Sequence, residues 1–121
     1  MNGRLLFSKE HMWVLIDGNV ASVGISDYAQ KRLKAVVFLN LPDVGEKYEV
    51  GDRIGDVESV KNVSDLISPI TGTILEVNDN LVDEPYLINE EPYNAWLIKM
   101  HISSVPEDLM DEETYKGKLN V

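Results

Sequence analysis

Residues 55–78 read "GDVESVKNVSDLISPITGTILEVN" and contain two runs of strand-forming residues that meet at Lys61. The runs "DVES" and "SDLI" flank the lysine and suit a pair of adjacent strands, which predicts Lys61 at the tip of a hairpin. Beyond it, a turn is predicted over Pro69 to Gly72. The alternation of residue types over 73–77 then predicts another strand. This stretch indicates a tightly folded antiparallel sheet from which one lysine protrudes.

Short strand-like segments continue on both sides of this hairpin. The sequence "HMWVLIDGNVASVGI", residues 11–25, predicts two strands joined at Asp17-Gly18-Asn19, because Asp-Gly between apolar runs favours a tight turn. Further strands are predicted over 35–41 and 94–102. Many short strands separated by Gly and Pro turns favour a sandwich or barrel. The sequence has neither a βαβ alternation nor a glycine-rich phosphate loop, which argues against a nucleotide-binding fold.

Two parts of the chain are predicted to be helical. Ser26 is a suitable N-cap for a short helix near residues 26–34. Near the C-terminus, Ser104 is predicted to cap a helix that Pro106 opens, and a second short helix is predicted over Asp111–Lys118.

The composition is that of a globular domain with an acidic surface. The chain has 121 residues, 44% of them hydrophobic, and a formal net charge of −10. This acidity argues against a nucleic-acid or anionic-lipid surface. It is consistent both with a solvated acidic surface and with a surface that attracts partners with basic docking patches, and acidity alone does not discriminate between them. The chain has no cysteine, which excludes disulfides, thiolate zinc sites and cysteine nucleophiles. Since no signal peptide or membrane span is recognised, we expect a cytoplasmic location, or the mitochondrial matrix if a transit peptide has been removed.

Lys61 has three interpretations from the residues alone. It is a solvated turn residue, a catalytic amine that forms a Schiff base, or an amine that another enzyme modifies. A Schiff-base lysine needs a pKa lowered by burial or by a neighbouring cation, whereas Glu58 and Asp65 favour the charged ammonium. These carboxylates do not hinder acylation, because the modifying enzyme supplies its own base and an activated acyl donor.

The histidines and tryptophans are predicted to have structural roles. His11 is interpreted as a hydrogen-bonded histidine at the end of a strand. His101 has no second ligand at a metal-binding spacing, so no metal site is expected. Trp13 and Trp96 are predicted to lie in the core or at its edge.

Five segments resemble the H protein of the glycine cleavage system, in the order and with the spacing of that family. They are "VGISDYAQKRL", "VFLNLPDVG", "GDVESVKNVSDLISPITGTILEVN", "LINEEPY" and "WLIKM". The resemblance extends from about Phe7 to about Tyr115. Biotin carriers typically have Met on both sides of their lysine, and lipoyl domains of the 2-oxo acid dehydrogenases usually have Asp-Lys-Ala. The Val-Lys-Asn of this chain is closer to the H-protein pattern.

The resemblance implies a mainly β barrel-sandwich hybrid of the lipoyl/biotinyl-domain type, with a short internal helix and a helical C-terminus. It implies one lipoyl-carrier domain over residues 1–121, with a core of about 7–102 and a helical extension of about 103–121. It also implies a non-catalytic carrier subunit. Because such a carrier docks to several enzymes in turn, we expect a monomer.

The cofactor that the resemblance implies is lipoate, joined to Lys61 as an amide. The surrounding attachment-site residues carried over from the family are Glu58, Ser59, Val60, Ser64 and Asp65. In the family, the arm shuttles the aminomethyl group of glycine from a pyridoxal-phosphate glycine decarboxylase (P protein) to a tetrahydrofolate-dependent aminomethyltransferase (T protein). Dihydrolipoyl dehydrogenase (L protein) reoxidises the arm, and a lipoate ligase or lipoyl/octanoyl transferase attaches it. Tethering raises the effective concentration of the carried group.

The chain departs from the family pattern at one residue of the expected cleft. The family usually reads His-Glu-Trp, and its glutamate helps to hold the aminomethyl ammonium; here Met12 takes that place. On a strand, positions 10 and 12 share a face, which leaves two interpretations: Glu10 replaces the missing cleft acid beside Asp65, or Met12 marks a cleft that never holds an amine. The departure also leaves an alternative, an H-protein-like lipoyl carrier that serves lipoate relay or sulfur oxidation.

Two further departures lie outside the expected cleft. Lys34-Ala35 replaces the Gly-Asp that commonly follows the helix in this family. Asn94-Ala95 lacks the glycine that is expected before Trp96.

Overall fold

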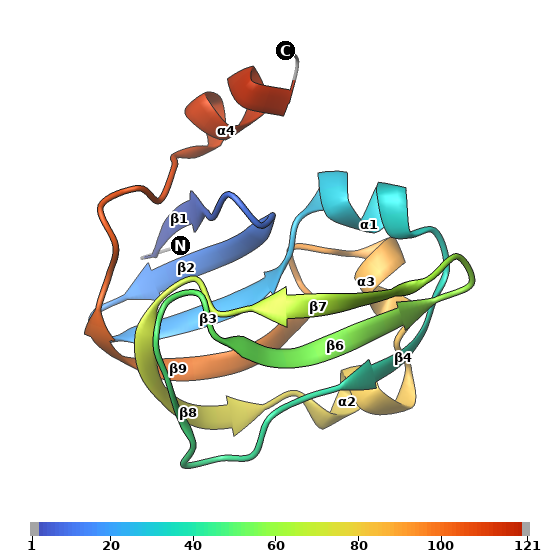
Figure 1. Cartoon of the computed structure of the whole chain (residues 1–121), viewed down its shortest axis with the longest axis horizontal. Helices are drawn as coiled ribbons and strands as arrows, with labels where there is room; N and C mark the ends of the chain where they lie inside the picture. The colour runs from blue at the N-terminus through green and yellow to red at the C-terminus, as the bar shows by residue number, and fades with distance from the viewer. Residues whose placement is uncertain (1–2, 120–121) are drawn as a thin grey trace.

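The computed structural model describes residues 3–119, which form two β-sheets facing each other across a core (Figure 1). The larger sheet has the strand order β1-β2-β3-β9-β8-β5, with bounds Arg4–Phe7, Met12–Asp17, Val20–Ile25, Trp96–Ser104, Thr71–Val77 and Lys47–Tyr48. The smaller sheet has the order β4-β6-β7, with bounds Val36–Asn40, Arg53–Ser59 and Val63–Ile67. All neighbouring strands are antiparallel. The helices are α1 Asp27–Leu33, α2 Asp79–Asp83, α3 Leu87–Glu90 and α4 Glu112–Leu119.

This arrangement confirms the predicted fold class, a mainly β sandwich with an internal helix and a helical C-terminus. The Asp-Gly turn joins β2 to β3, with Gly18 at φ 63°. Ser26 caps α1 as predicted, since its Oγ accepts the backbone N–H of Ala29. Local sequence signals therefore place these two elements correctly.

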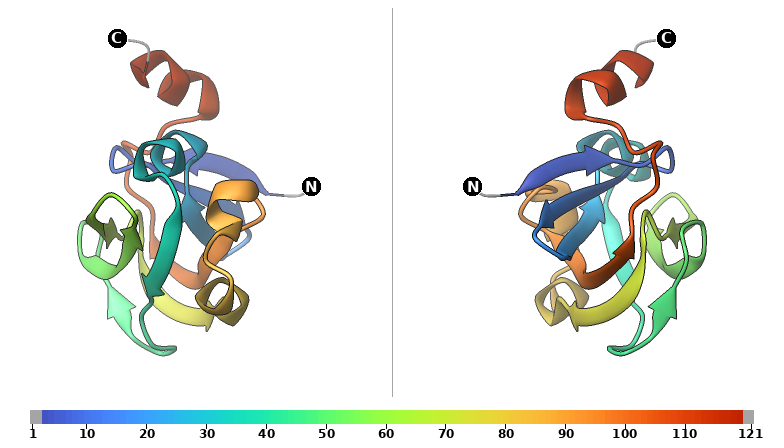
Figure 2. Two further views of the ribbon diagram at one scale, coloured as in Figure 1. Left: turned by 90° about the vertical axis from the view of Figure 1, so that its right-hand side faces the viewer. Right: turned by 90° about the vertical axis from the view of Figure 1, so that its left-hand side faces the viewer.

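The core lies between the two sheets, which the side views in Figure 2 show as separate layers. Apolar residues of both sheets are buried there, among them Val14, Val23 and Ile98 from the larger sheet and Val57 and Leu66 from the smaller one. Burying each such side chain contributes about 1.5–3 kcal/mol. The smaller sheet is thereby held firmly against the larger one, and the hairpin that carries Lys61 belongs to it.

The chain after β9 differs from the prediction. We expected a helix from Ser104 and Pro106, but Ser104 still belongs to β9 and residues 105–111 contain no helix. Instead, Phe7 and Met110 exchange two backbone hydrogen bonds of 2.7 and 2.8 Å. These bonds pair the backbone of Met110 with β1, so the segment is extended at this point. The second predicted helix is present as α4, which lies beside β1 (Figure 1).

Other elements were not predicted from the sequence. They are β1, β5, α2 and α3. The predicted turn over Pro69 to Gly72 is shorter than expected, because β8 already begins at Thr71. Among residues 3–119, no helix is long and apolar enough to cross a membrane.

Candidate functional site

Lys61 lies in the three-residue connection between β6 and β7, as predicted. Ser59 fixes the shape of this loop. Its Oγ accepts the backbone N–H groups of Lys61 (3.1 Å) and Asn62 (3.2 Å), and its own N–H donates to the carbonyl of Asn62 (2.9 Å). The backbone that presents the lysine is therefore ordered by local hydrogen bonds, as in a well-defined turn.

The base of the loop is tied to the segment between α1 and β4. The N–H of Val60 donates to the carbonyl of Ala35 at 3.0 Å. Asn89 of α3 holds the same segment, since its Nδ2 donates to the carbonyl of Lys34 (2.7 Å) and its Oδ1 accepts the N–H of Val36 (2.8 Å). The position of the lysine loop thus depends on a helix that is distant in sequence.

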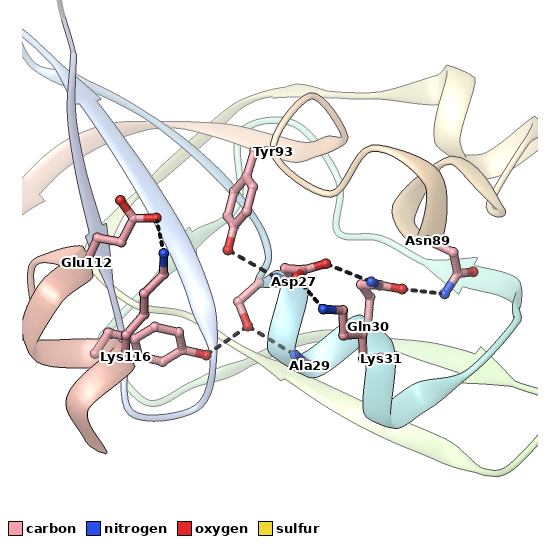
Figure 3. A network of polar contacts seen from close by, with 10 residues as sticks. Asp27, Ala29, Gln30, Lys31, Asn89, Tyr93, Glu112 and Lys116 are labelled. Atoms are coloured by element: carbon pink, nitrogen blue, oxygen red, sulfur yellow. Dashed lines mark hydrogen bonds and ion pairs between the residues drawn. The ribbon is translucent and has the colours of Figure 1, made fainter. Parts of the chain in front are cut away.

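Asn89 also takes part in a polar network along α1, which Figure 3 shows. Its Nδ2 donates to Gln30 Oε1 at 3.0 Å, and Gln30 Nε2 donates to Asp27 Oδ1 at 2.8 Å. Asp27 forms an ion pair with Lys31, and the hydrogen bond from Gln30 does most to lower its pKa. This network fixes α1, which forms one wall of the pocket beside Lys61.

The side chain of Lys61 is exposed and takes part in no ion pair among residues 3–119. A Schiff-base lysine is usually activated inside an apolar pocket, whereas the side chain of Lys61 is exposed to solvent. An exposed, unpaired amine at a loop tip is accessible to a second enzyme. The geometry therefore fits modification better than catalysis.

A pocket of about 260 Å³ lies between α1 and the lysine hairpin. Both expected cleft acids line it, together with Lys61. The full lining is Glu10, His11, Met12, Ile25, Ala29, Arg32, Leu33, Val57, Lys61, Asn62, Ser64, Asp65 and Leu66. The lining thus combines buried apolar side chains with two exposed carboxylates.

Glu10 reaches this pocket for a reason that differs from the prediction. We expected it to share a strand face with Met12, but β2 begins only at Met12, and Glu10 lies in the preceding turn. Met12 points into the core and is 3% exposed, whereas Glu10 is exposed. The turn includes His11 at φ 70°, whose N–H donates to the carbonyl of Ser8. The strand argument was wrong, although Glu10 does line the pocket.

The two carboxylates of the pocket are not equivalent. Asp65 Oδ1 accepts a hydrogen bond from Arg53 Nε at 2.9 Å, and the same guanidinium also contacts Asp56. These contacts, led by the hydrogen bond with Asp65, raise the pKa of Arg53. Glu10 has no ion pair among residues 3–119. Glu10 is therefore the carboxylate that is available to a cation in the pocket.

His11 is a hydrogen-bonded histidine just before β2, as predicted. Its Nδ1 lies 2.8 Å from Tyr115 Oη, which in turn lies 2.8 Å from Ser26 Oγ. Burial lowers the pKa of His11, the charge of Arg32 lowers it further, and Glu10 opposes both effects. These effects together favour the uncharged form of His11, and Tyr115 connects this wall of the pocket to α4.

Sequence reasoning did not nominate Arg32, which brings a positive charge to the pocket. The signal was present, because Ala29, Arg32 and Leu33 are three and four residues apart and so share one face of α1. The other residues named in advance, Glu58, Ser59 and Val60, surround the loop rather than the pocket. Trp13 is buried, and Trp96 lies partly exposed at the core edge, as predicted.

Two facing sheets that present one exposed lysine on a hairpin define a class of protein, the barrel-sandwich carriers of the lipoyl/biotinyl type. Comparison with known proteins narrows this class. Residues 5–120 match the family described as Glycine cleavage H-protein.

Curated relatives and a solved structure agree with this match. The chain is 49% identical to a glycine cleavage system H protein of Herpetosiphon aurantiacus, over 96% of this chain and 91% of that protein. It is 46% identical to one of Bacteroides thetaiotaomicron, over 96% of this chain and 94% of the relative. The crystal structure of a glycine cleavage system H protein from Mycobacterium marinum superposes with a TM-score of 0.91 at 38% identity, and each chain is covered completely. The chain belongs to the glycine cleavage H-protein family.

Proposed function

We propose that this chain is a lipoyl carrier of glycine cleavage and that Lys61 is the attachment residue. The observation that supports the proposal most strongly is the exposed, unpaired Lys61 on an ordered hairpin beside a pocket that contains Glu10 and Asp65. The carrier subunit has no catalytic residue of its own in this proposal. It passes the aminomethyl group of glycine from the pyridoxal-phosphate decarboxylase to the tetrahydrofolate-dependent aminomethyltransferase.

The residues around Lys61 fit an amide-linked lipoyl group. Acylation removes the charge of the Nζ atom, and Lys61 has no ion pair among the described residues that this change would break. The hairpin holds the lysine backbone in place, so only the side chain and its extension move. When attached, lipoate supplies the sulfur chemistry that the cysteine-free chain lacks.

Glu10 and Asp65 have a distinct role in this proposal. Their carboxylates accept hydrogen bonds from an ammonium group that enters the pocket, and such charge-assisted bonds are stronger than neutral ones. Met12, Ile25 and Leu33 provide apolar surface that limits the access of water. Glu10 contributes more to binding the ammonium group than Asp65 does, because Asp65 already forms an ion pair with Arg53.

The partners follow from the same proposal. They are the P, T and L proteins of glycine cleavage and an enzyme that attaches lipoate, either a ligase or a lipoyl/octanoyl transferase. We propose that residues 1–121 form one carrier domain that acts as a monomer.

The alternative, a lipoyl carrier of another pathway, rested on the loss of the cleft glutamate at Met12. Glu10 lines the pocket and supplies a carboxylate there despite Met12, which favours the glycine cleavage function. The relatives named above are glycine cleavage system H proteins, which favours the same function. Both functions require lipoylation, so they differ only in their partner enzymes.

The proposal is tested with lipoylated protein and a purified glycine decarboxylase, by following glycine-dependent exchange of labelled carbon dioxide. The wild type and the control variant Lys9→Arg should support exchange, whereas Lys61→Arg should not. Glu10→Gln should weaken exchange more than the exposed control Glu49→Gln. A lipoylated wild type that supports no exchange would reject the glycine cleavage function and favour the other pathways.

A further inference from the structure

Tyr115 is the residue through which α4 reaches the wall of the pocket. Its side chain is buried, and its ring stacks on that of Phe7 with centroids 4.4 Å apart. Within the described part of α4, Glu112 and Lys116 pair with each other (Figure 3), and Tyr115 makes the side-chain hydrogen bonds that lead to the rest of the fold. A helix this short is unstable on its own, so the position of α4 depends on this anchored tyrosine.

The buried hydroxyl of Ser26 fixes the direction of the hydrogen bonds that join Tyr115 to His11. Ser26 is 0% exposed, so its O–H needs an acceptor inside the protein. Its Oγ already accepts the N–H of Ala29, and Tyr115 Oη, at 2.8 Å, is the acceptor that residues 3–119 offer to the O–H. Ser26 therefore donates to Tyr115, and Tyr115 in turn donates to His11 Nδ1, also at 2.8 Å.

We propose that Tyr115 is a positioning residue that keeps His11 uncharged, with its proton on Nε2, so that Glu10 beside it stays available to a cation in the pocket. A proton on Nδ1 would reverse both hydrogen bonds. Nδ1 would donate to Tyr115, Tyr115 would donate to Ser26, and the buried Ser26 hydroxyl would lose its acceptor, which is costly. The inference rests on the proposed function where it takes this cation to be the aminomethyl ammonium.

The charges around His11 act in the same direction as the hydrogen bonds, with one exception. Burial and the charge of Arg32 lower the pKa of His11, whereas Glu10 raises it. A protonated His11 would pair its charge with the neighbouring Glu10 and repel an ammonium group that enters the pocket. The titratable and charged groups that face His11 come from its own turn, from α1, from α4 and from the lysine hairpin; they are Glu10, Tyr28, Arg32, Tyr115, Lys61 and Asp65.

The test observes the imidazole nitrogens by NMR in full-length, ¹⁵N-labelled protein without lipoate. The chain has two histidines, and His101 lies on β9 outside the pocket, so it serves as an internal reference. In the wild type, Nδ1 of His11 should have the chemical shift of an unprotonated nitrogen and Nε2 that of an N–H nitrogen. Tyr115→Phe keeps the ring but removes the hydroxyl. The two shifts should then move toward each other, and the pKa of His11 should rise, while the signals of His101 stay unchanged.

Ser26→Ala is the matched control, because it removes the other end of the same hydrogen-bonded chain. The Tyr115 hydroxyl then still has His11 Nδ1 as an acceptor, so the proton of His11 should stay on Nε2. If Nδ1 were the donor in the wild type, Ser26→Ala would release the Tyr115 hydroxyl and move that proton from Nδ1 to Nε2. The amide spectrum of each variant verifies the fold.

Three NMR results would overturn the inference. They are a wild type with its His11 proton on Nδ1, a Tyr115→Phe variant with the wild-type shifts and pKa, and a change of tautomer in Ser26→Ala. None of these measurements requires lipoate or a partner enzyme.

The effect on the pocket is tested with lipoylated protein and a purified glycine decarboxylase. The pH profile of glycine-dependent carbon dioxide exchange should lose activity at a higher pH with Tyr115→Phe than with the wild type, because His11 becomes charged at a higher pH. Ser26→Ala should keep the wild-type profile. A raised pKa of His11 with an unmoved profile would overturn the role of Tyr115 in the pocket. A lipoylated wild type without exchange at any pH would reject the proposed function, whereas the NMR result would still decide where His11 carries its proton.

Discussion

Replacing Lys34 with glycine should stabilise the protein. Lys34 follows α1 with φ 67° and ψ −152°, a conformation that side-chain-bearing residues rarely adopt. Such a residue stores about 1–3 kcal/mol of strain. Glycine adopts this conformation freely but loses about 0.5–1 kcal/mol more conformational entropy on folding. The difference predicts that Lys34→Gly raises the free energy of unfolding by about 1 kcal/mol.

The structure also explains why the strain persists. The Lys34 carbonyl accepts a hydrogen bond from Asn89, and the next carbonyl, that of Ala35, accepts the N–H of Val60 in the lysine loop. The surrounding contacts therefore hold the segment in place. The Gly-Asp that is common at this point in the family avoids the same cost.

Urea unfolding measures this prediction with two controls. Lys34→Ala keeps the Cβ atom and should stay within about 0.5 kcal/mol of the wild type, since the exposed side chain has no ion pair among the described residues. Lys31→Gly, within α1, should destabilise by about 1 kcal/mol, because glycine is a poor helix former and the pair with Asp27 is lost. If Lys34→Gly is no more stable than Lys34→Ala, the reasoning about strain is refuted.

Three further perturbations test other parts of the structure. Tyr115→Phe should destabilise by about 1–3 kcal/mol in urea unfolding, because the fully buried hydroxyl of Ser26 loses a partner; an unchanged midpoint would contradict this. Burial lowers the pKa of His11 below its ordinary 6.5, so the unfolded chain binds that proton more readily. The histidine's contribution to stability should be fully present at pH values well above 6.5 and should be lost as the pH falls below 6.5. His11→Asn should remove this part of the pH dependence, and an unchanged curve would show that another group is responsible. Gly55→Ala should destabilise severely, since its Cβ would overlap the carbonyl oxygen of Asn40. In contrast, the Cβ of Gly117→Ala in α4 meets no atom within 4 Å, and this substitution should stabilise by about 0.5–1 kcal/mol. Equal effects at the two glycines, measured by thermal unfolding, would show that contact at Gly55 does not matter.

Elements with local signals were predictable from the sequence. The turn at Asp17-Gly18-Asn19 and the cap at Ser26 depend on residues close together in the chain, and both are present. The lysine hairpin was predictable for the same reason. Its flanking runs form β6 and β7, with Lys61 between them.

Elements that depend on distant partners were not predictable from local signals. The segment around Pro106 has helix-start residues, but pairing between Phe7 and Met110 across the fold replaces the helix. Asn89 supports the lysine loop from α3, and no local pattern indicates that contact. The place of Glu10 on the pocket rim depends on the conformation of a turn, which strand periodicity does not describe.

The most direct test of the central claim is the intact mass of the protein after co-expression with a lipoate ligase in the presence of lipoate. The wild type should gain the mass of one lipoyl group, peptide mapping should place it on Lys61, and Lys61→Arg should gain none. An unmodified wild type, or a Lys61→Arg variant that still gains the group, would contradict the claim that this exposed lysine is the carrier residue.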